Sequence, residues 1–214
     1  MNYDNAKKGI GRIYTAEILE ILATIVAIVA VVLMTILGAV LKDGESVNVT
    51  DVISVISLIV SGVIAIVAFF LNLTGINNAS KDEESFKTAL TMLFIQFGAY
   101  ILSTVFTNKG GLSSILGAVS NIAELLVVYY IIRGCISIAA KKGNKDVETA
   151  GNSAIRIYMI VWVVGIVVNF LAGMINKGEA MSVIVGILSV GALILAIIGY
   201  IVYLKVLRKT VDML

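Results

Sequence analysis

The sequence has no histidine and no proline, and it has one cysteine in 214 residues. Without histidine there is no imidazole to act as a general base, to bind a metal or to activate a serine or cysteine nucleophile. Cys135 alone forms neither an internal disulfide nor a thiolate metal cluster. The sequence therefore predicts no metal site and no cofactor, and the absence of proline favours helices without a central break.

Charge is also scarce. Charged residues make up 14% of the chain, whereas they average about a quarter of a soluble domain. Hydrophobic residues make up 59%, against about half in a soluble domain. The mean hydropathy is +1.03. The net charge of +2 is too small to indicate binding to nucleic acid. This composition excludes an ordinary soluble domain and a disordered chain.

Long uncharged runs fill most of the sequence. Five contain 20 to 29 residues, and a sixth is interrupted only by Glu124. About 20 apolar helical residues cross a bilayer core about 30 Å thick. The runs do not alternate between polar and apolar residues, as barrel strands do, so helices are predicted. The expected fold is an all-α, polytopic membrane protein with six transmembrane helices, at residues 21–41, 52–76, 88–108, 110–132, 157–176 and 180–204.

Basic residues are distributed unevenly between the two sides that six spans create. Thirteen of the sixteen fall on the side that carries both termini, and Lys42, Lys109 and Lys177 fall on the other. Because an excess of Lys and Arg in short loops marks the cytoplasmic side, we expect a multi-pass plasma-membrane protein with both termini in the cytoplasm. Aromatic residues near that side are expected to anchor the helices at the membrane boundary rather than form a binding cage. They are Phe69, Phe70, Tyr129, Tyr130, Tyr158, Tyr200 and Tyr203.

The chain contains a repeat of two helices. Lys42, Lys109 and Lys177 lie in similar turns separated by 67 and 68 residues, and Lys209 follows Lys141 by 68. We interpret the chain as a single membrane domain, 1–214, made of three tandem helical hairpins. The hairpins are predicted at residues 1–77, 78–142 and 143–214. Since all of them start on the same side, they suit a pseudo-threefold arrangement about the membrane normal.

Glu124 lies in the middle of the fourth run. A carboxylate inside a bilayer costs about 2.5 kcal/mol or more and is by default a functional hypothesis. Asn121 lies on the same helix face, and Gln96 and Asn169 are expected at comparable depth. These four residues are predicted to line one polar pocket, either a proton or cation site or a polar handle for a ligand. The alternative is a neutral Glu124 that hydrogen-bonds Gln or Asn as a contact between helices.

Other charged residues are expected at the membrane boundary. Glu17 and Glu20 are predicted to lie at the cytoplasmic mouth as partners of Arg12. The acidic run 82–84 is predicted to form the first turn of the third helix, where it suits the helix dipole, or alternatively a docking patch for a cytoplasmic partner. A basic rim is predicted to contact lipid headgroups. The rim consists of Arg133, Arg156, Lys141 and Lys142.

Three features of the sequence resemble those of a known group of proteins. They are the repeated hairpins, the Asn-Ala-Lys-Lys segment at 5–8 and the Ala-Ser-Lys-Asp-Glu-Glu segment at 79–84. The chain resembles uncharacterised six-helix integral membrane proteins of Gram-positive anaerobic bacteria, over its whole length. The resemblance implies a bacterial plasma-membrane protein and no known activity. In size and number of spans the chain is also similar to substrate-binding subunits of vitamin-uptake transporters, but no ligand motif of that family is present.

No Walker loop, nucleophile elbow or zinc-protease motif occurs, so we expect a protein that is not an enzyme and has no catalytic residue. It is predicted to bind a membrane-protein partner, a second copy of itself, a lipid or a small ligand, and no nucleic acid. One alternative is a small channel or a proton- or cation-coupled transporter that uses Glu124. Another is an accessory subunit of a larger membrane complex.

Overall fold

The structure, a computed structural model, describes the backbone of residues 3–40, 47–107, 110–172 and 179–214. These residues form six helices and no strand, and each helix is long and apolar enough to cross a membrane. The prediction of an all-α fold with six such helices is therefore confirmed. The helices are α1 (Asp4–Val40), α2 (Val47–Ala79), α3 (Glu84–Val105), α4 (Gly110–Lys142), α5 (Lys145–Ala172) and α6 (Glu179–Met213).

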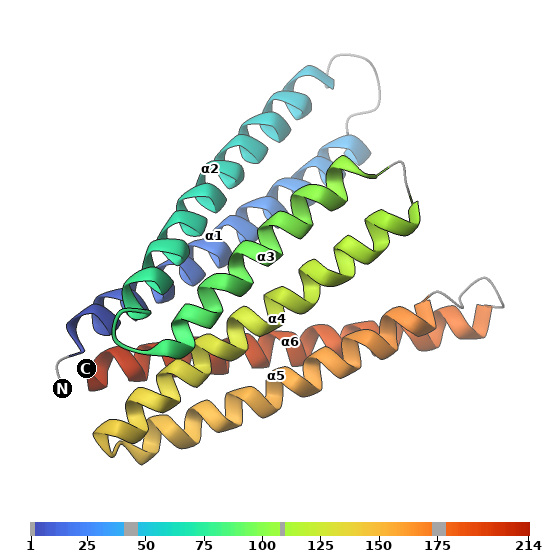
Figure 1. Ribbon diagram of the computed structural model, residues 1–214. Coiled ribbons are helices and arrows are strands. Elements are labelled where there is room, and N and C mark those ends of the chain that lie inside the picture. The colour runs from blue at the N-terminus through green and yellow to red at the C-terminus, as the bar shows by residue number, and fades with distance from the viewer. Residues whose placement is uncertain (1–2, 41–46, 108–109, 173–178) are drawn as a thin grey trace.

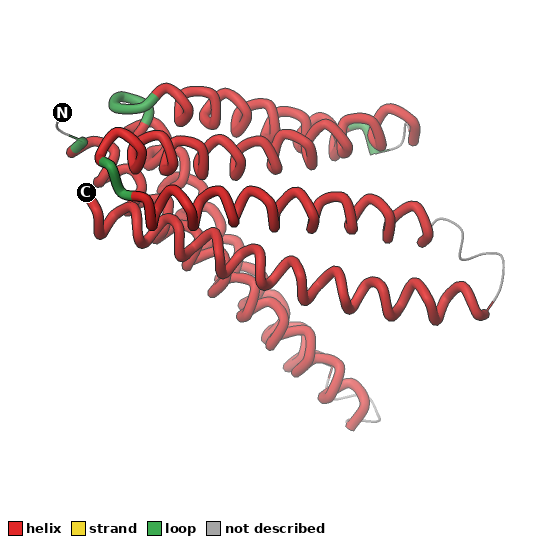
Figure 2. The backbone as a smooth tube through the Cα atoms, turned by 90° about the horizontal axis from the view of Figure 1, so that it is seen from below, coloured by secondary structure: helices red, strands yellow, loops and turns green. Residues whose placement is uncertain are grey.

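Consecutive helices pair as antiparallel hairpins, α1 with α2, α3 with α4 and α5 with α6 (Figure 1). Between hairpins, α2 contacts α3, α4 contacts α5 and α6 contacts α1, which closes a ring. This cyclic order is the one that a pseudo-threefold arrangement requires, although α4 also contacts α6 and makes the ring uneven. The N- and C-termini lie at one end, which we call the terminal end, and the hairpins spread apart with distance from it (Figure 2).

The buried core lies at the terminal end. Its side chains come from the beginnings of α1, α3 and α5 and from the last turns of α2, α4 and α6. Ile10, Phe86, Ile131 and Tyr203, from four different helices, are all fully buried. Inside lipid, helices associate through close packing rather than through exclusion of water. The core therefore holds the hairpins together at this end, where they are closest.

A pair of glycines brings α1 and α2 into close contact. A Cβ atom added to Gly9 would lie 2.5 Å from the carbonyl oxygen of Gly75, and one added to Gly75 would lie 2.8 Å from that of Gly9. Small residues let helix backbones approach in this way. The contact lies in the part of α1 that precedes the apolar run starting at residue 21.

The acidic run 82–84 has a different structural role from the predicted one. The carboxylate of Asp82 accepts hydrogen bonds from the backbone N–H of Ala6, at 2.7 Å, and from the side chain of Asn5, at 3.0 Å. It therefore caps one of the free backbone N–H groups at the start of α1. Since α3 begins only at Glu84, the run does not form the first turn of that helix as a whole.

Ion pairs close two of the hairpins at the terminal end. Lys141, at the end of α4, pairs with Glu83 next to the start of α3, with 2.5 Å between nitrogen and oxygen. Lys209, near the end of α6, pairs with Asp146 at the start of α5, at 2.6 Å. Lys141 and Lys209 are the two lysines that the 68-residue spacing made equivalent. Their acidic partners, Glu83 and Asp146, are 63 residues apart, so the two contacts are not related by that spacing and the repeat stays a prediction.

The predicted repeat boundaries lie close to helix ends. The boundary after residue 142 coincides with the end of α4, and the boundary after residue 77 lies two residues before the end of α2 at Ala79. The predicted turns around Lys42, Lys109 and Lys177 lie outside the described residues.

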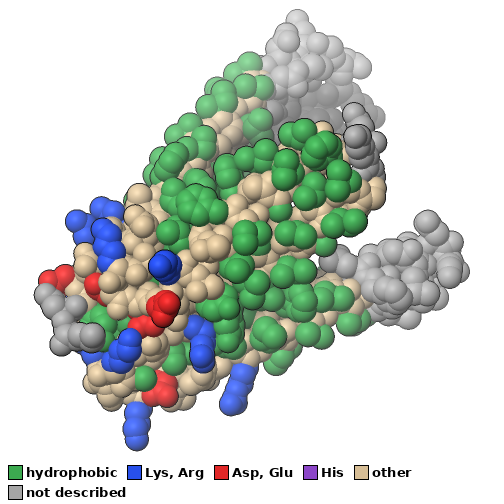
Figure 3. All heavy atoms as spheres, viewed as in Figure 1, with side chains coloured by type: hydrophobic (Ala, Val, Ile, Leu, Met, Phe, Trp, Pro, Cys, Tyr) green, Lys and Arg blue, Asp and Glu red, His purple; other side chains and the backbone are tan. Residues whose placement is uncertain are grey.

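The two ends of the described surface differ in chemistry. Charged side chains gather around the terminal end, whereas hydrophobic side chains cover the visible face of the helices beyond it (Figure 3). Many large apolar side chains there are more than half exposed, among them Leu58, Val105 and Ile187. Such a surface suits contact with a lipid bilayer rather than with water.

Candidate functional site

A cavity of about 1060 Å³ lies next to the core, on its side away from the terminal end. Side chains of α1 through α6 line it. On α1, for example, the core includes Ile10 and Ile13, and the cavity begins one turn further along the helix, at Glu17. The volume is that of a site for a drug-sized ligand. Its carboxyl and carboxamide groups belong to Glu17, Glu20, Asn72, Gln96, Asn121 and Glu124.

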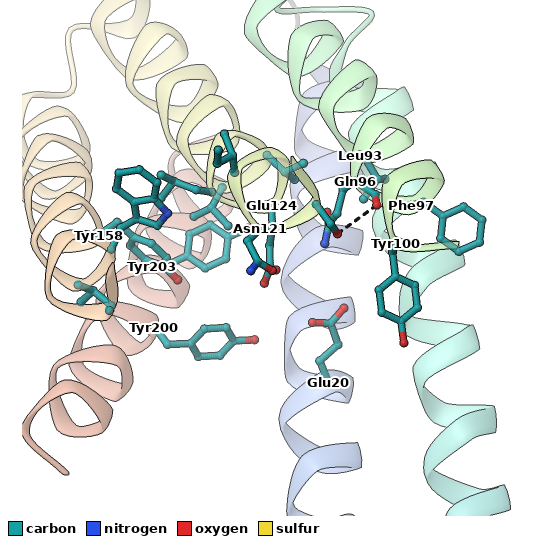
Figure 4. Close-up of a pocket in the computed structure, with 18 of the residues that line it drawn as sticks. Glu20, Leu93, Gln96, Phe97, Tyr100, Asn121, Glu124, Tyr158, Tyr200 and Tyr203 are labelled. Atoms are coloured by element: carbon teal, nitrogen blue, oxygen red, sulfur yellow. Dashed lines mark hydrogen bonds between the residues drawn. The ribbon is translucent and has the colours of Figure 1, made fainter. Parts of the chain in front are cut away.

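The structure brings together three of the four residues predicted to form a polar pocket. Glu124 and Asn121 of α4 line the cavity, and so does Gln96 of α3. Figure 4 shows the side chains of Glu124 and Asn121 next to each other, directed into the cavity. The side chain of the fourth residue, Asn169, lies outside the described residues. Within the described part of the chain, no hydrogen bond joins the carboxyl group of Glu124 to Gln96 or Asn121.

Glu17 departs from its prediction. Its side chain is buried and accepts hydrogen bonds from the hydroxyls of Tyr200, at 2.7 Å, and Tyr203, at 3.2 Å. Tyr200 also donates to the backbone carbonyl of Glu17, at 3.0 Å. The expectation that Glu17 pairs with Arg12 is therefore wrong, because α6 packs against α1 and its tyrosines bind the carboxyl group.

Glu20, one turn further along α1, is exposed within the cavity. Its carboxylate and the hydroxyl of Tyr200 point toward the same space from α1 and α6 (Figure 4). The sequence contained a signal for this arrangement. Glu17 and Glu20 are three residues apart, as are Tyr200 and Tyr203, so each pair occupies one helix face. The local pattern alone does not say that the two faces meet.

Aromatic rings form much of the remaining wall. The rings of Phe69 and Phe97 stack with centroids 5.0 Å apart, and those of Tyr158 and Tyr203 meet edge to face at 5.9 Å. All four residues line the cavity, together with Trp162. The expectation that Phe69, Tyr158 and Tyr203 serve only as boundary anchors is therefore wrong, since their rings face the interior of the bundle.

One carboxamide in the wall has an unused acceptor. Among the described residues, the side-chain oxygen of Asn72 on α2 is buried without a hydrogen-bond partner. A buried polar atom without a partner is costly, and at a cavity wall it is available to a donor on a ligand. Asn72 was not among the predicted site residues.

The described lining residues include acidic groups and no basic ones. Glu17, Glu20 and Glu124 contribute carboxyl groups, and the described wall contains no lysine or arginine. No group of three or more acidic or cysteine residues in the described chain is arranged to hold a metal ion. The cavity thus combines spread carboxylates, carboxamides and aromatic faces. These are the groups that recognise an organic cation.

The predicted basic rim divides into two parts. Arg133 and Arg156 are exposed and available to lipid headgroups. Lys141 is engaged with Glu83, and Lys142 donates a hydrogen bond to the backbone carbonyl of Met213 at 3.3 Å. Contact with lipid headgroups therefore stays a prediction mainly for the two arginines of the rim.

Comparison with protein-family models, with curated proteins and with solved structures found no match for the chain. The resemblance to six-helix bacterial membrane proteins therefore stays a prediction.

Proposed function

We propose that the protein is a non-enzymatic integral membrane protein that binds a small cation in the cavity between its hairpins. The observation that carries this proposal is the placement of Glu17, Glu20 and Glu124 around one space whose described wall has no basic residue. Carboxylates at such depth are costly in a bilayer, and a bound cation compensates for that cost. The proposal includes a plasma-membrane location with both termini in the cytoplasm, on the basis of the basic terminal end.

Transport of the bound cation is the second candidate. The polar cavity in the middle of the helices favours it, because transporters place their binding sites near the bilayer midplane. The core next to the cavity, with Ile10 and Ile131 fully buried, separates the ligand from the terminal end. Transport would therefore need the core to open, whereas binding does not. Service as an accessory subunit, or association with a second copy, is compatible with either activity.

The binding proposal is tested with the single tryptophan of the chain. Because Trp162 lines the cavity, its fluorescence reports occupancy directly. We expect tetramethylammonium, added to protein in nanodiscs, to change this fluorescence saturably in the wild type. The double variant Glu20→Gln/Glu124→Gln should bind at least 10-fold more weakly. The control is Glu84→Gln, an exposed acid at the terminal end. Equal affinity in all three proteins would refute the proposal.

Flux measurements separate binding from transport. Liposomes that contain the wild-type protein are given gradients of protons, sodium, potassium and tetramethylammonium. Flux that disappears in Glu20→Gln/Glu124→Gln would establish transport. Saturable binding without flux would establish a binding protein.

A further inference from the structure

A second, smaller hollow lies on the seam between α1 and α6. This groove has a volume of about 390 Å³, and its wall is almost entirely apolar. Its lining residues are Ile21, Ala196, Ile197, Tyr200, Ile201 and Leu204. Ile197 and Ile201 are more than half exposed, so the groove belongs to the surface that suits lipid.

The groove adjoins the acidic cavity. Tyr200 lines both of them, and Ile21 of the groove directly follows Glu20 of the cavity. The hydroxyl of Tyr200 is held by Glu17, and the residue stands where the two spaces meet. A ligand with a charged end and an apolar end can therefore place each end in matching surroundings.

The cavity itself favours an organic cation over an inorganic one. Its volume far exceeds that of a metal ion, and its carboxylates are not grouped as metal ligands within the described chain. Aromatic faces, here those of Tyr158, Trp162 and Tyr200, attract ammonium groups whose hydration is weak. A soft, partly apolar cation satisfies all of these features at once.

From this geometry we infer that the ligand is a lipophilic organic cation, such as an alkylammonium, whose charge lies in the cavity near Glu20 and Glu124 and whose apolar tail lies in the α1–α6 groove. The inference rests on the proposed function and adds the ligand class and its route. Because the groove faces the apolar surface, the ligand enters from the bilayer between α1 and α6. The acidic groups beyond the groove, with no basic residue in the described wall, then select cations from among the lipophilic molecules that the bilayer holds.

The test compares two cations that share a head group and differ in the tail. Octyltrimethylammonium and tetramethylammonium are titrated against protein in nanodiscs, with Trp162 fluorescence as the readout. Each methylene that leaves water strengthens binding about fourfold, so even partial seating of the tail predicts at least about 10-fold tighter binding of the octyl compound. Because the octyl compound also partitions into lipid, a variant must show that the groove is responsible.

Ala196→Phe fills the groove with a ring, and Ala196→Leu fills it less. Both variants should lose most of the advantage of the octyl compound and keep the wild-type affinity for tetramethylammonium, which also shows that they are folded. Ala192→Phe, one turn away on α6 and in neither wall, is the matched control and should behave as wild type.

The outcomes separate the two proposals. If both cations bind and the Ala196 variants keep the full octyl advantage, the groove inference is wrong and the cation site stands. If octanol, an uncharged compound with the same tail, competes as well as octyltrimethylammonium, the assignment of a cationic ligand is wrong. If neither ammonium compound binds, the proposed function itself fails.

Discussion

The terminal end and the cavity are built from the same helices, yet their acidic side chains differ in whether they have basic partners. At the terminal end, Glu83 and Asp146 each pair with a lysine, and Asp82 caps α1. In the cavity, Glu20 and Glu124 face open space without a basic residue in the described wall. Charges that stabilise a fold are expected to be paired, whereas unpaired charges in a bilayer indicate a ligand. The comparison therefore assigns stability to one region and binding to the other.

The largest expected effect is on the packing of the terminal end. Gly75→Val places a side chain where a Cβ alone would lie 2.8 Å from both the Gly9 oxygen and Ile13. Overpacking of this kind costs about 3 kcal/mol of the free energy of unfolding. Gly62→Val on the same helix is the control, because a Cβ there meets nothing within 4 Å. Thermal unfolding in detergent measures both, and equal melting temperatures would contradict the close contact of α1 with α2.

The second largest loss of stability is expected from removal of the lysine that pairs with a buried acid. Glu83 is 8% exposed, so Lys141→Met leaves its carboxylate without a cationic partner and should cost about 2 kcal/mol of unfolding free energy. Lys209→Met removes the other pair, in which Asp146 is 74% exposed, and should cost well under 1 kcal/mol. Equilibrium unfolding of both variants gives the difference. A larger loss for Lys209→Met would reverse the ranking of the two pairs.

The cavity should respond in affinity rather than in stability. Glu20→Gln/Glu124→Gln should weaken cation binding at least 10-fold, or about 1.4 kcal/mol, because the amides keep the shape and lose the charge. The melting temperature without ligand should not fall. A double variant that unfolds more readily than the wild type but binds the cation equally well would show that Glu20 and Glu124 stabilise the fold and do not bind the ligand.

The smallest of the main effects concerns the cap on α1. Asp82→Ala removes the acceptor for the backbone N–H of Ala6 and should cost about 1 kcal/mol. Asp82→Asn keeps an acceptor and should recover most of that loss. Unfolding of the two variants, read by circular dichroism, tests whether Asp82 acts as a cap. Equal losses in both would show that the hydrogen bond to Ala6 contributes nothing.

Sequence reasoning reached the fold and part of the site, for separable physical reasons. Each apolar run carries its own evidence for a membrane helix, so the helices were predictable one by one. Glu124 and Asn121 were predictable because a polar residue inside such a run stands out whatever its neighbours are. The partners of Glu17 were predicted wrongly, because its place was inferred by alignment of the first hairpin with the second. The partners of Glu17 on α6 lie about 180 residues away, beyond the reach of any local pattern.

The central claim is that the cavity selects positive charge, and two probes of nearly equal shape and opposite charge test it most directly. Tetraphenylphosphonium and tetraphenylborate are titrated against the wild type and Glu20→Gln/Glu124→Gln, with Trp162 fluorescence as the readout and empty nanodiscs to correct for partition into lipid. The account predicts saturable binding of the phosphonium to the wild type, at least 10-fold weaker binding to the variant, and no saturable binding of the borate to the wild type. Wild-type protein that binds both probes equally, or a variant that binds the phosphonium as well as the wild type does, would contradict it.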